Sequence, residues 1–207
     1  MKKSILFFII CTPFLAIAMT PEEGIQRLME GNARYVSGEM HAPRRDEERR
    51  QETLKVQNPF AIIVTCSDSR VAPEIVFDEG IGDLFVVRDA GNVIAAIEKE
   101  SVEYSAGILN SSVVLVMGHK NCGAVNAVLN GQLKGISTIA KLIEPAVLKA
   151  KKECSDDCLK LAIKFNALNM KRALMQSPLL KRLVQEDTLI IRAAYFDLNL
   201  GTVELLD

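Results

Sequence analysis

The chain has 207 residues, of which 49% are hydrophobic, and its formal net charge at pH 7 is −1. A chain of this length can bury one sizeable core, so we expect a single domain. The near-neutral charge and the lack of a basic stripe interleaved with aromatic side chains exclude nucleic acid as an expected partner.

The first 18 residues differ in character from everything that follows. Lys2 and Lys3 precede an apolar run over residues 5–17, and the Ala-Ile-Ala tripeptide at 16–18 has the small-x-small pattern that signal peptidase accepts. This combination is typical of a cleavable signal peptide. We therefore expect residues 1–18 to be removed and the protein to be exported to the periplasm.

After cleavage, residues 19–207 would form the mature domain. The apolar run is shorter than the roughly 20 residues that a membrane span needs, so we expect no stable membrane insertion. An uncleaved anchor is the main alternative. A lipid anchor on Cys11 is disfavoured, because bulky Ile10 stands where lipidation sites have a small residue.

The mature chain begins with a predicted amphipathic helix over residues 21–32. Ile25, Leu28 and Met29 fall on one stripe, and we expect Gly31 to end the helix. The stripe has no obvious partner within the same chain. This predicts an N-terminal arm that packs on a second subunit, and hence a homodimer or a larger homo-oligomer.

A second, polar helix is expected over residues 43–56. Its basic side chains alternate with acidic ones, which favours a solvated helix face. The basic side chains concerned are Arg44, Arg45, Arg49 and Arg50.

Short apolar runs then alternate with helical stretches. Continuous apolar runs are typical of strands buried on both faces of a parallel sheet. The expected strands cover residues 60–65, 84–87, 113–117 and 189–191, the intervening helices residues 95–110 and 159–176, and a turn with an edge strand residues 195–206. The predicted fold class is α/β, with a central, mostly parallel sheet of four parallel strands plus an edge strand, flanked by helices.

Two cysteine-bearing motifs come directly after two of these strands. They are Cys-Ser-Asp-Ser-Arg at 66–70 and Gly-His-Lys-Asn-Cys-Gly at 118–123. Ligands collect beyond the carboxyl ends of the strands in open parallel sheets, so the two motifs can converge. Two thiolates, one imidazole and a carboxylate or water form a set that suits four-coordinate Zn²⁺.

A third segment, Gly-Asp-Leu-Phe-Val-Val-Arg-Asp-Ala-Gly-Asn at 82–92, lies between the two motifs. In order and spacing, the three segments together resemble the signature of the β-class carbonic anhydrases. The resemblance extends over nearly all of the mature chain, from the Gly-Asn-Ala-Arg-Tyr segment at 31–35 to the Gly-Thr-Val segment at 201–203.

The resemblance implies one Zn²⁺ per subunit, held by Cys66, His119 and Cys122. Asp68 and Arg70 would form the family's carboxylate and guanidinium dyad, although in some members the aspartate itself takes the fourth metal position. The implied reaction is the reversible hydration of carbon dioxide to bicarbonate and a proton, by attack of a zinc-bound hydroxide that the dyad orients. At neutral pH the fourth metal position could be open to water or closed by Asp68, and the motifs allow both arrangements.

By position in the family pattern, Gln57, Phe85, Tyr104 and Gly123 are expected to line the substrate pocket, in part across a subunit interface. The chain contains no Trp, so the tryptophan-containing bicarbonate lock of one family branch is absent in its usual form, which favours the open type of site.

The chain departs from the family pattern at two positions. Ile81 stands where the family usually has Pro, and Asp89 follows Arg88 where Asn is common. We expect the adjoining loop to differ in shape or charge, without an effect on zinc binding.

Three further residues each have two possible roles. Cys154 and Cys158 flank a turn-forming segment and could form a local disulfide in an oxidising compartment or stay as free thiols. His41, in a polar loop, is either a proton relay or a solvent-facing side chain.

Two rival functions remain at this stage. One is a hydrolase of carbon disulfide or carbonyl sulfide with the same scaffold and metal centre. The other is a non-catalytic zinc-binding module, whose metal is permanently closed by Asp68 and whose role is interaction or assembly.

Overall fold

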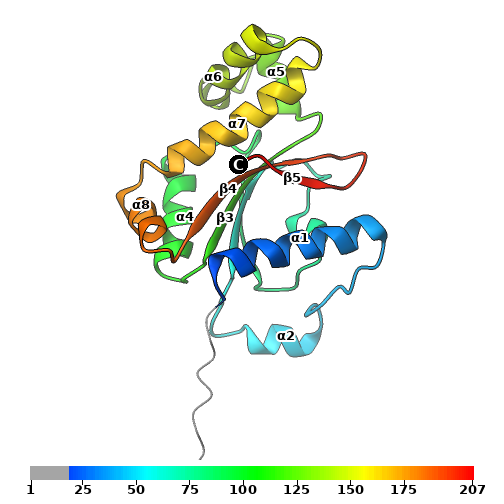
Figure 1. Ribbon diagram of the computed structural model, residues 1–207, viewed down its shortest axis with the longest axis vertical. Coiled ribbons are helices and arrows are strands. Elements are labelled where there is room, and N and C mark those ends of the chain that lie inside the picture. Colours follow the sequence, from blue (N-terminus) through cyan, green and yellow to red (C-terminus); the bar gives the residue numbers. More distant parts are fainter. Residues whose placement is uncertain (1–18) are drawn as a thin grey trace, which may run out of the picture.

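The structure, a computed structural model, describes residues 19–207 (Figure 1). The predicted signal peptide at 1–18 lies outside the described residues and stays a prediction. Within the described part of the chain, no helix is both long enough and apolar enough to span a bilayer.

The described residues form eight helices and five strands. The helices are α1 (Pro21–Ser37), α2 (Glu47–Glu52), α3 (Pro73–Val76), α4 (Ala96–Gly107), α5 (Gly123–Leu129), α6 (Ser137–Glu153), α7 (Cys158–Leu174) and α8 (Pro178–Gln185). The strands are β1 (Ala61–Thr65), β2 (Leu84–Arg88), β3 (Val113–His119), β4 (Ile190–Phe196) and β5 (Val203–Leu205).

The strands form one sheet in the order β2-β1-β3-β4-β5. The pairs β1–β2, β1–β3 and β3–β4 are parallel, and β5 pairs antiparallel with β4. This confirms the predicted α/β class and the edge strand. The fourth strand is longer than predicted, because Tyr195 and Phe196 continue β4 instead of beginning the turn.

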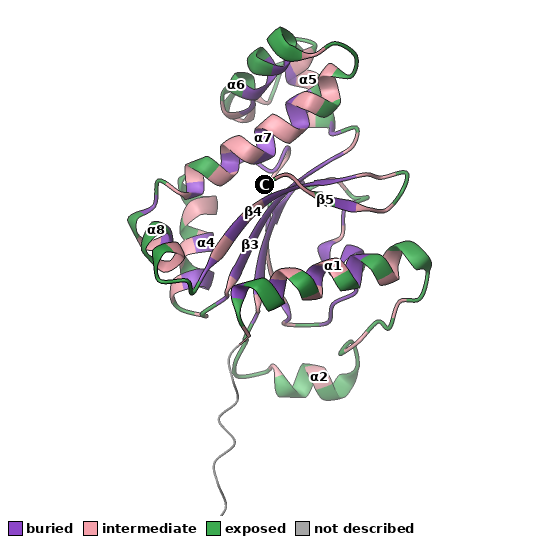
Figure 2. Ribbon diagram, viewed as in Figure 1, coloured by how far each residue is buried: buried purple, intermediate pink, exposed green. Residues whose placement is uncertain are grey.

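Both faces of the sheet are covered, as the continuous apolar runs require. Every residue of β1 and β3 is buried, and Figure 2 shows the central strands in the colour of buried residues. Ile62 and Val64 pack under the face covered by α4 to α8, whereas Ala61 and Ile63 pack under α1 and α3. The two-residue alternation of a strand therefore divides one apolar run between two cores.

Gly31 does not end the first helix. α1 continues to Ser37 and ends at Gly38, whose φ of 77° is the left-handed conformation favoured by glycine. Gly31 instead lies against the end of α3, where an added Cβ would come within 1.8 Å of the Phe77 carbonyl oxygen. The residue therefore permits a close approach of two backbones.

The apolar stripe of α1 is buried within its own chain, so our reason for an arm on a second subunit was wrong. Leu28 is 1% exposed and belongs to the core under α1, with Ile25 and Met29 packed against it. The Asn32 amide donates to the carbonyls of Val76 and Gly201, which fixes the helix on the fold. α1 is thus a covering helix of the sheet.

The second helix is shorter than predicted. Arginines in it and just before it also contact acidic side chains and backbone carbonyls, so they are not merely solvated. Arg44 lies 2.6 Å from the Asp83 carboxylate, and Arg49 lies 3.4 Å from it. Arg45 donates to the backbone carbonyl of Glu79. The basic run therefore attaches the segment around α2 to the buried acidic loop before β2.

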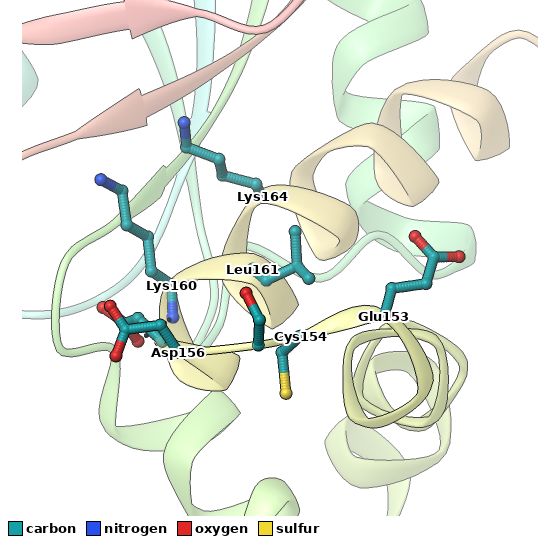
Figure 3. Close-up of a pocket in the computed structure, with 8 residues that line it drawn as sticks. Glu153, Cys154, Asp156, Lys160, Leu161 and Lys164 are labelled. Atoms are coloured by element: carbon teal, nitrogen blue, oxygen red, sulfur yellow. Dashed lines mark hydrogen bonds between the residues drawn. The ribbon is translucent and has the colours of Figure 1, made fainter.

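Cys154 and Cys158 form a disulfide that connects the end of α6 with the first residue of α7. Beside it lies a cavity of about 290 Å³. Lys160 and Lys164, on successive turns of α7, are among the residues that line it (Figure 3). None of the residues predicted for the active site lines this cavity.

Candidate metal centre

The predicted ligands converge because two neighbouring strands end at the same level. Thr65, the last residue of β1, pairs with Met117 of β3, so Cys66 lies opposite Gly118. His119 ends β3, and Cys122 is the N-cap of α5. His119 and Cys122 therefore reach one point from a strand end and a helix start, not from two positions of a single helix.

The three ligand atoms form a compact, buried group. The Cys66 and Cys122 sulfurs and a His119 ring nitrogen all lie within 4.8 Å of one another. The two sulfurs are 4.0 Å apart, close to the separation of about 3.8 Å that two Zn–S bonds of 2.3 Å make at a tetrahedral angle. The donor set and its spacing therefore fit a tetrahedral zinc ion.

The environment of His119 prepares one ring nitrogen for a metal. The Nδ1 atom lies 2.9 Å from the Lys120 carbonyl oxygen, to which it can only donate. This tautomer leaves a lone pair on Nε2, which is buried and has no hydrogen-bond partner among residues 19–207. An orphaned buried acceptor, oriented by a backbone carbonyl on the other nitrogen, is the arrangement typical of metal-binding histidines.

The two sulfurs lie in contact, and each shifts the pKa of the other. Cys122 donates to the Cys66 sulfur, which lowers the pKa of Cys66 below that of a free thiol. The same contact and burial raise the pKa of Cys122. The thiolate form is thus favoured at Cys66, and a bound dication would also favour the thiolate form of Cys122.

Asp68 and Arg70, the residues of the predicted dyad, form an ion pair. The Arg70 guanidinium makes a two-point contact with the Asp68 carboxylate, at 2.9 Å from Nε and 2.7 Å from Nη2. This pairing holds the pKa of Asp68 well below its usual range. Asp68 is therefore a carboxylate at neutral pH, paired with the Arg70 guanidinium.

Asp68 is close to the ligand group without being part of it. Its Oδ2 atom lies 3.7 Å from the His119 Nε2 atom, but the group of possible metal ligands comprises only Cys66, His119 and Cys122. The structure thus places the carboxylate beside this group, paired with Arg70.

The end of β2 and the loop after it donate hydrogen bonds to the site, which sequence reasoning missed. Arg88 donates to the carbonyls of Cys66 and Asp68, and the Gly91 N–H donates to the Cys66 sulfur at 3.2 Å. Both residues belong to the third recognised segment, but the pattern gave no role to either. Asp89, which stands in the same segment where the family commonly has Asn, is partly buried. Its burial, and secondarily the negative charge of Glu98, raise the pKa of its carboxyl group.

Of the predicted pocket residues, only Gly123 lies at the ligand group of its own chain, directly after Cys122. Phe85 pairs with Ile62, four positions before Cys66 and hence about 13 Å lower along the sheet. Tyr104 lies against Phe85, with ring centroids 6.2 Å apart. Gln57 is exposed in the segment before β1.

Comparisons with known proteins agree with this geometry. The carbonic anhydrase family model matches residues 61–203. Carbonic anhydrase 2 of Mycobacterium tuberculosis is 40% identical over 139 residues, which cover 64% of this chain and 67% of that protein. The carbonic anhydrase of Mycolicibacterium smegmatis is 39% identical over 138 residues, with the same shares of the two chains.

A solved structure supports the same assignment. The β-carbonic anhydrase CcaA superposes with a TM-score of 0.70 at 25% identity, covering 88% of this chain and 87% of that chain. The match of the family model spans more than half of the chain and includes all three metal-ligand positions. The chain therefore belongs to the β-carbonic anhydrase family.

Proposed function

We propose that this protein is a zinc enzyme that catalyses the reversible hydration of carbon dioxide to bicarbonate. The observation that carries the proposal is the buried group of Cys66, His119 and Cys122 beside the Asp68 carboxylate, which is paired with Arg70. Bound there, Zn²⁺ would act as a Lewis acid that makes a water molecule a nucleophile near neutral pH.

The dyad performs two tasks in this reaction. Arg70 donates to both carboxylate oxygens of Asp68, and this pairing would keep the carboxylate from binding the zinc ion that Cys66, His119 and Cys122 would hold. Asp68, ionised and 3.7 Å from the His119 nitrogen, is placed to accept a hydrogen bond from the nucleophile. That bond would fix the direction of attack on carbon dioxide, which is a large part of what an enzyme contributes to a rate.

The charges of the ligands favour product release. Two thiolates balance the charge of a divalent ion, so a bicarbonate anion at the site meets no net positive charge. His119, neutral in its ligating tautomer, does not change this balance.

Stopped-flow hydration of carbon dioxide by zinc-loaded residues 19–207, from about pH 6.5 to 9, tests the proposal. Activity is expected already near neutral pH, because Arg70 holds Asp68 off the metal position. Activity only at alkaline pH would contradict this open arrangement. Stoichiometric zinc without hydration at any pH would favour the non-catalytic module, and preferential turnover of carbon disulfide or carbonyl sulfide would favour the hydrolase.

We further propose that the protein is a homodimer that associates through the outer edge of β2. Ile97, Tyr104 and Ile108 are exposed on one face of α4, at helical spacings of seven and four residues. This face packs beside β2, the parallel edge strand, through the Tyr104 and Phe85 rings. Exposed apolar side chains next to an open strand edge are typical of an interface.

The same interface would give the predicted pocket residues a role. Phe85 and Tyr104 lie at this edge and away from the ligand group of their own chain. Across a dimer interface they could contribute to the site of the second subunit, as the family pattern implies.

Replacing Ile108 with arginine is expected to shift the protein from dimer to monomer in sedimentation velocity at micromolar concentration. A buried, unpaired guanidinium is strongly unfavourable in an apolar interface. Leu200→Arg is the matched control, because Leu200 is 66% exposed against 67% for Ile108 but lies in the turn before β5. A monomeric wild type, or equal effects of the two variants, would refute the proposed interface.

A further inference from the structure

The loop that joins β2 to α4 is attached to α7 by a buried polar side chain. Asn166, in the middle of α7, is 0% exposed. Its Nδ2 atom donates to the Gly91 carbonyl oxygen at 2.7 Å. α7, yellow to orange in Figure 1, is otherwise packed through apolar residues such as Ile163 and Leu174. An amide in such a position needs an explanation.

Gly91 is held between Asn166 and a metal ligand. Its carbonyl accepts from Asn166, and its N–H donates to the Cys66 sulfur. A turn closed by the hydrogen bond from the Asn92 N–H to the Asp89 carbonyl, at 2.9 Å, surrounds it, and its φ of 77° is natural only for glycine. Since the turn is closed, fixing the carbonyl also fixes the direction of the N–H.

A second contact attaches the same loop one helical turn further along α7. The Ile94 N–H donates to the Met170 sulfur at 3.1 Å. Asn166 and Met170 are four residues apart and hence on one face of the helix. The loop is therefore positioned by α7 at two points, on either side of Asn92.

Stability alone does not account for the amide. The Oδ1 atom of Asn166 and both amide atoms of Asn92 are buried without a hydrogen-bond partner in the described part of the chain. Unpaired buried polar atoms are unfavourable; an apolar residue of similar size at 166 would remove the unpaired Oδ1 atom but would leave the Gly91 carbonyl without this donor. The role of Asn166 is thus better sought in what its one hydrogen bond orients.

We propose that Asn166 is a positioning residue of the metal centre, which acts by aiming the Gly91 N–H at the Cys66 sulfur. This hydrogen bond spreads the negative charge of the thiolate and fixes the sulfur in the direction of the metal. Hydrogen-bond partners of metal ligands typically change metal affinity ten- to a hundredfold. The inference rests on the zinc site proposed above, and not on the substrate.

The test compares Asn166→Leu with Leu174→Ala in full-length domains of residues 19–207. Leu174 is equally buried on α7 but lies in the apolar core, so both variants are expected to lower the melting temperature. Only Asn166→Leu is expected to weaken zinc binding, roughly tenfold or more in competition with a chelator. It should also move the thiolate-to-metal absorption band of the cobalt-loaded protein to longer wavelength, because the sulfur lone pair loses a stabilising hydrogen bond.

Unchanged zinc affinity and an unchanged cobalt band in Asn166→Leu would overturn the proposal and leave Asn166 a structural residue. If the wild type itself fails to bind zinc, the metal site is wrong and not this inference. If Asn166→Leu does not fold, wild-type protein loaded with cadmium-113 provides the answer. A scalar coupling between the metal and the Gly91 amide proton is expected across the N–H···S bond, and its absence would refute that bond.

Discussion

Replacing Cys122 with serine is expected to abolish zinc binding and to reduce hydration of carbon dioxide to the uncatalysed rate. Cys122 is one of the three residues of the candidate metal-binding group, and its buried sulfur lies 4.0 Å from that of Cys66. A serine hydroxyl is not ionised at neutral pH and cannot replace a thiolate as a zinc ligand. Without the metal, nothing lowers the pKa of water at the site, so a loss of at least roughly 10⁴-fold in kcat/KM is expected.

Metal analysis of the purified protein and stopped-flow hydration check this expectation together. The matched control is the double variant Cys154→Ser/Cys158→Ser, which removes two cysteines of the disulfide but no metal ligand. It should keep one zinc per subunit and wild-type activity. Stoichiometric zinc and substantial activity in Cys122→Ser would show that the centre lies elsewhere.

Replacing Arg70 with alanine is expected to retain zinc but to lower kcat/KM near neutral pH by about 10²-fold. Removal of Arg70 lets the pKa of Asp68 return towards its ordinary value of about 3.9, so the carboxylate stays charged at pH 7. A free carboxylate 3.7 Å from the His119 nitrogen is then available to take the fourth metal position. Activity should recover as pH rises, when hydroxide competes with the carboxylate.

The double variant Asp68→Asn/Arg70→Ala separates this explanation from a general loss of structure. If Asp68 closes the metal in Arg70→Ala, removing its charge reopens the site, and the double variant should be no slower than the single one. The visible spectrum of the cobalt-loaded proteins should show an altered ligand set in Arg70→Ala only. Wild-type rates for Arg70→Ala at neutral pH would mean that other contacts hold Asp68 off the metal.

The sequence by itself determined the features that depend on local pattern. Continuous apolar runs predicted the four parallel strands, because a strand buried on both faces leaves no polar position. Cys66, Asp68, Arg70, His119 and Cys122 were recognisable, since short motifs directly after strands are carried to the same edge of a parallel sheet. The dyad was implied by the resemblance to the family, and its two residues, Asp68 and Arg70, are neighbours in one loop that form an ion pair.

The tertiary structure decided what depends on contacts between distant segments. Leu28 and its neighbours are buried within the chain, which amphipathic spacing alone could not tell from burial against a second subunit. Phe85 lies four positions below Cys66 along the sheet, because strand register and not sequence distance sets the height of a side chain. Asn166 reaches Gly91 across 75 residues, and a lone asparagine in a helical stretch carries no local signal of such a contact. The candidate metal ligands could therefore be predicted from short motifs. The hydrogen bonds that position Cys66 through Gly91 form only where α7 and the loop after β2 pack together.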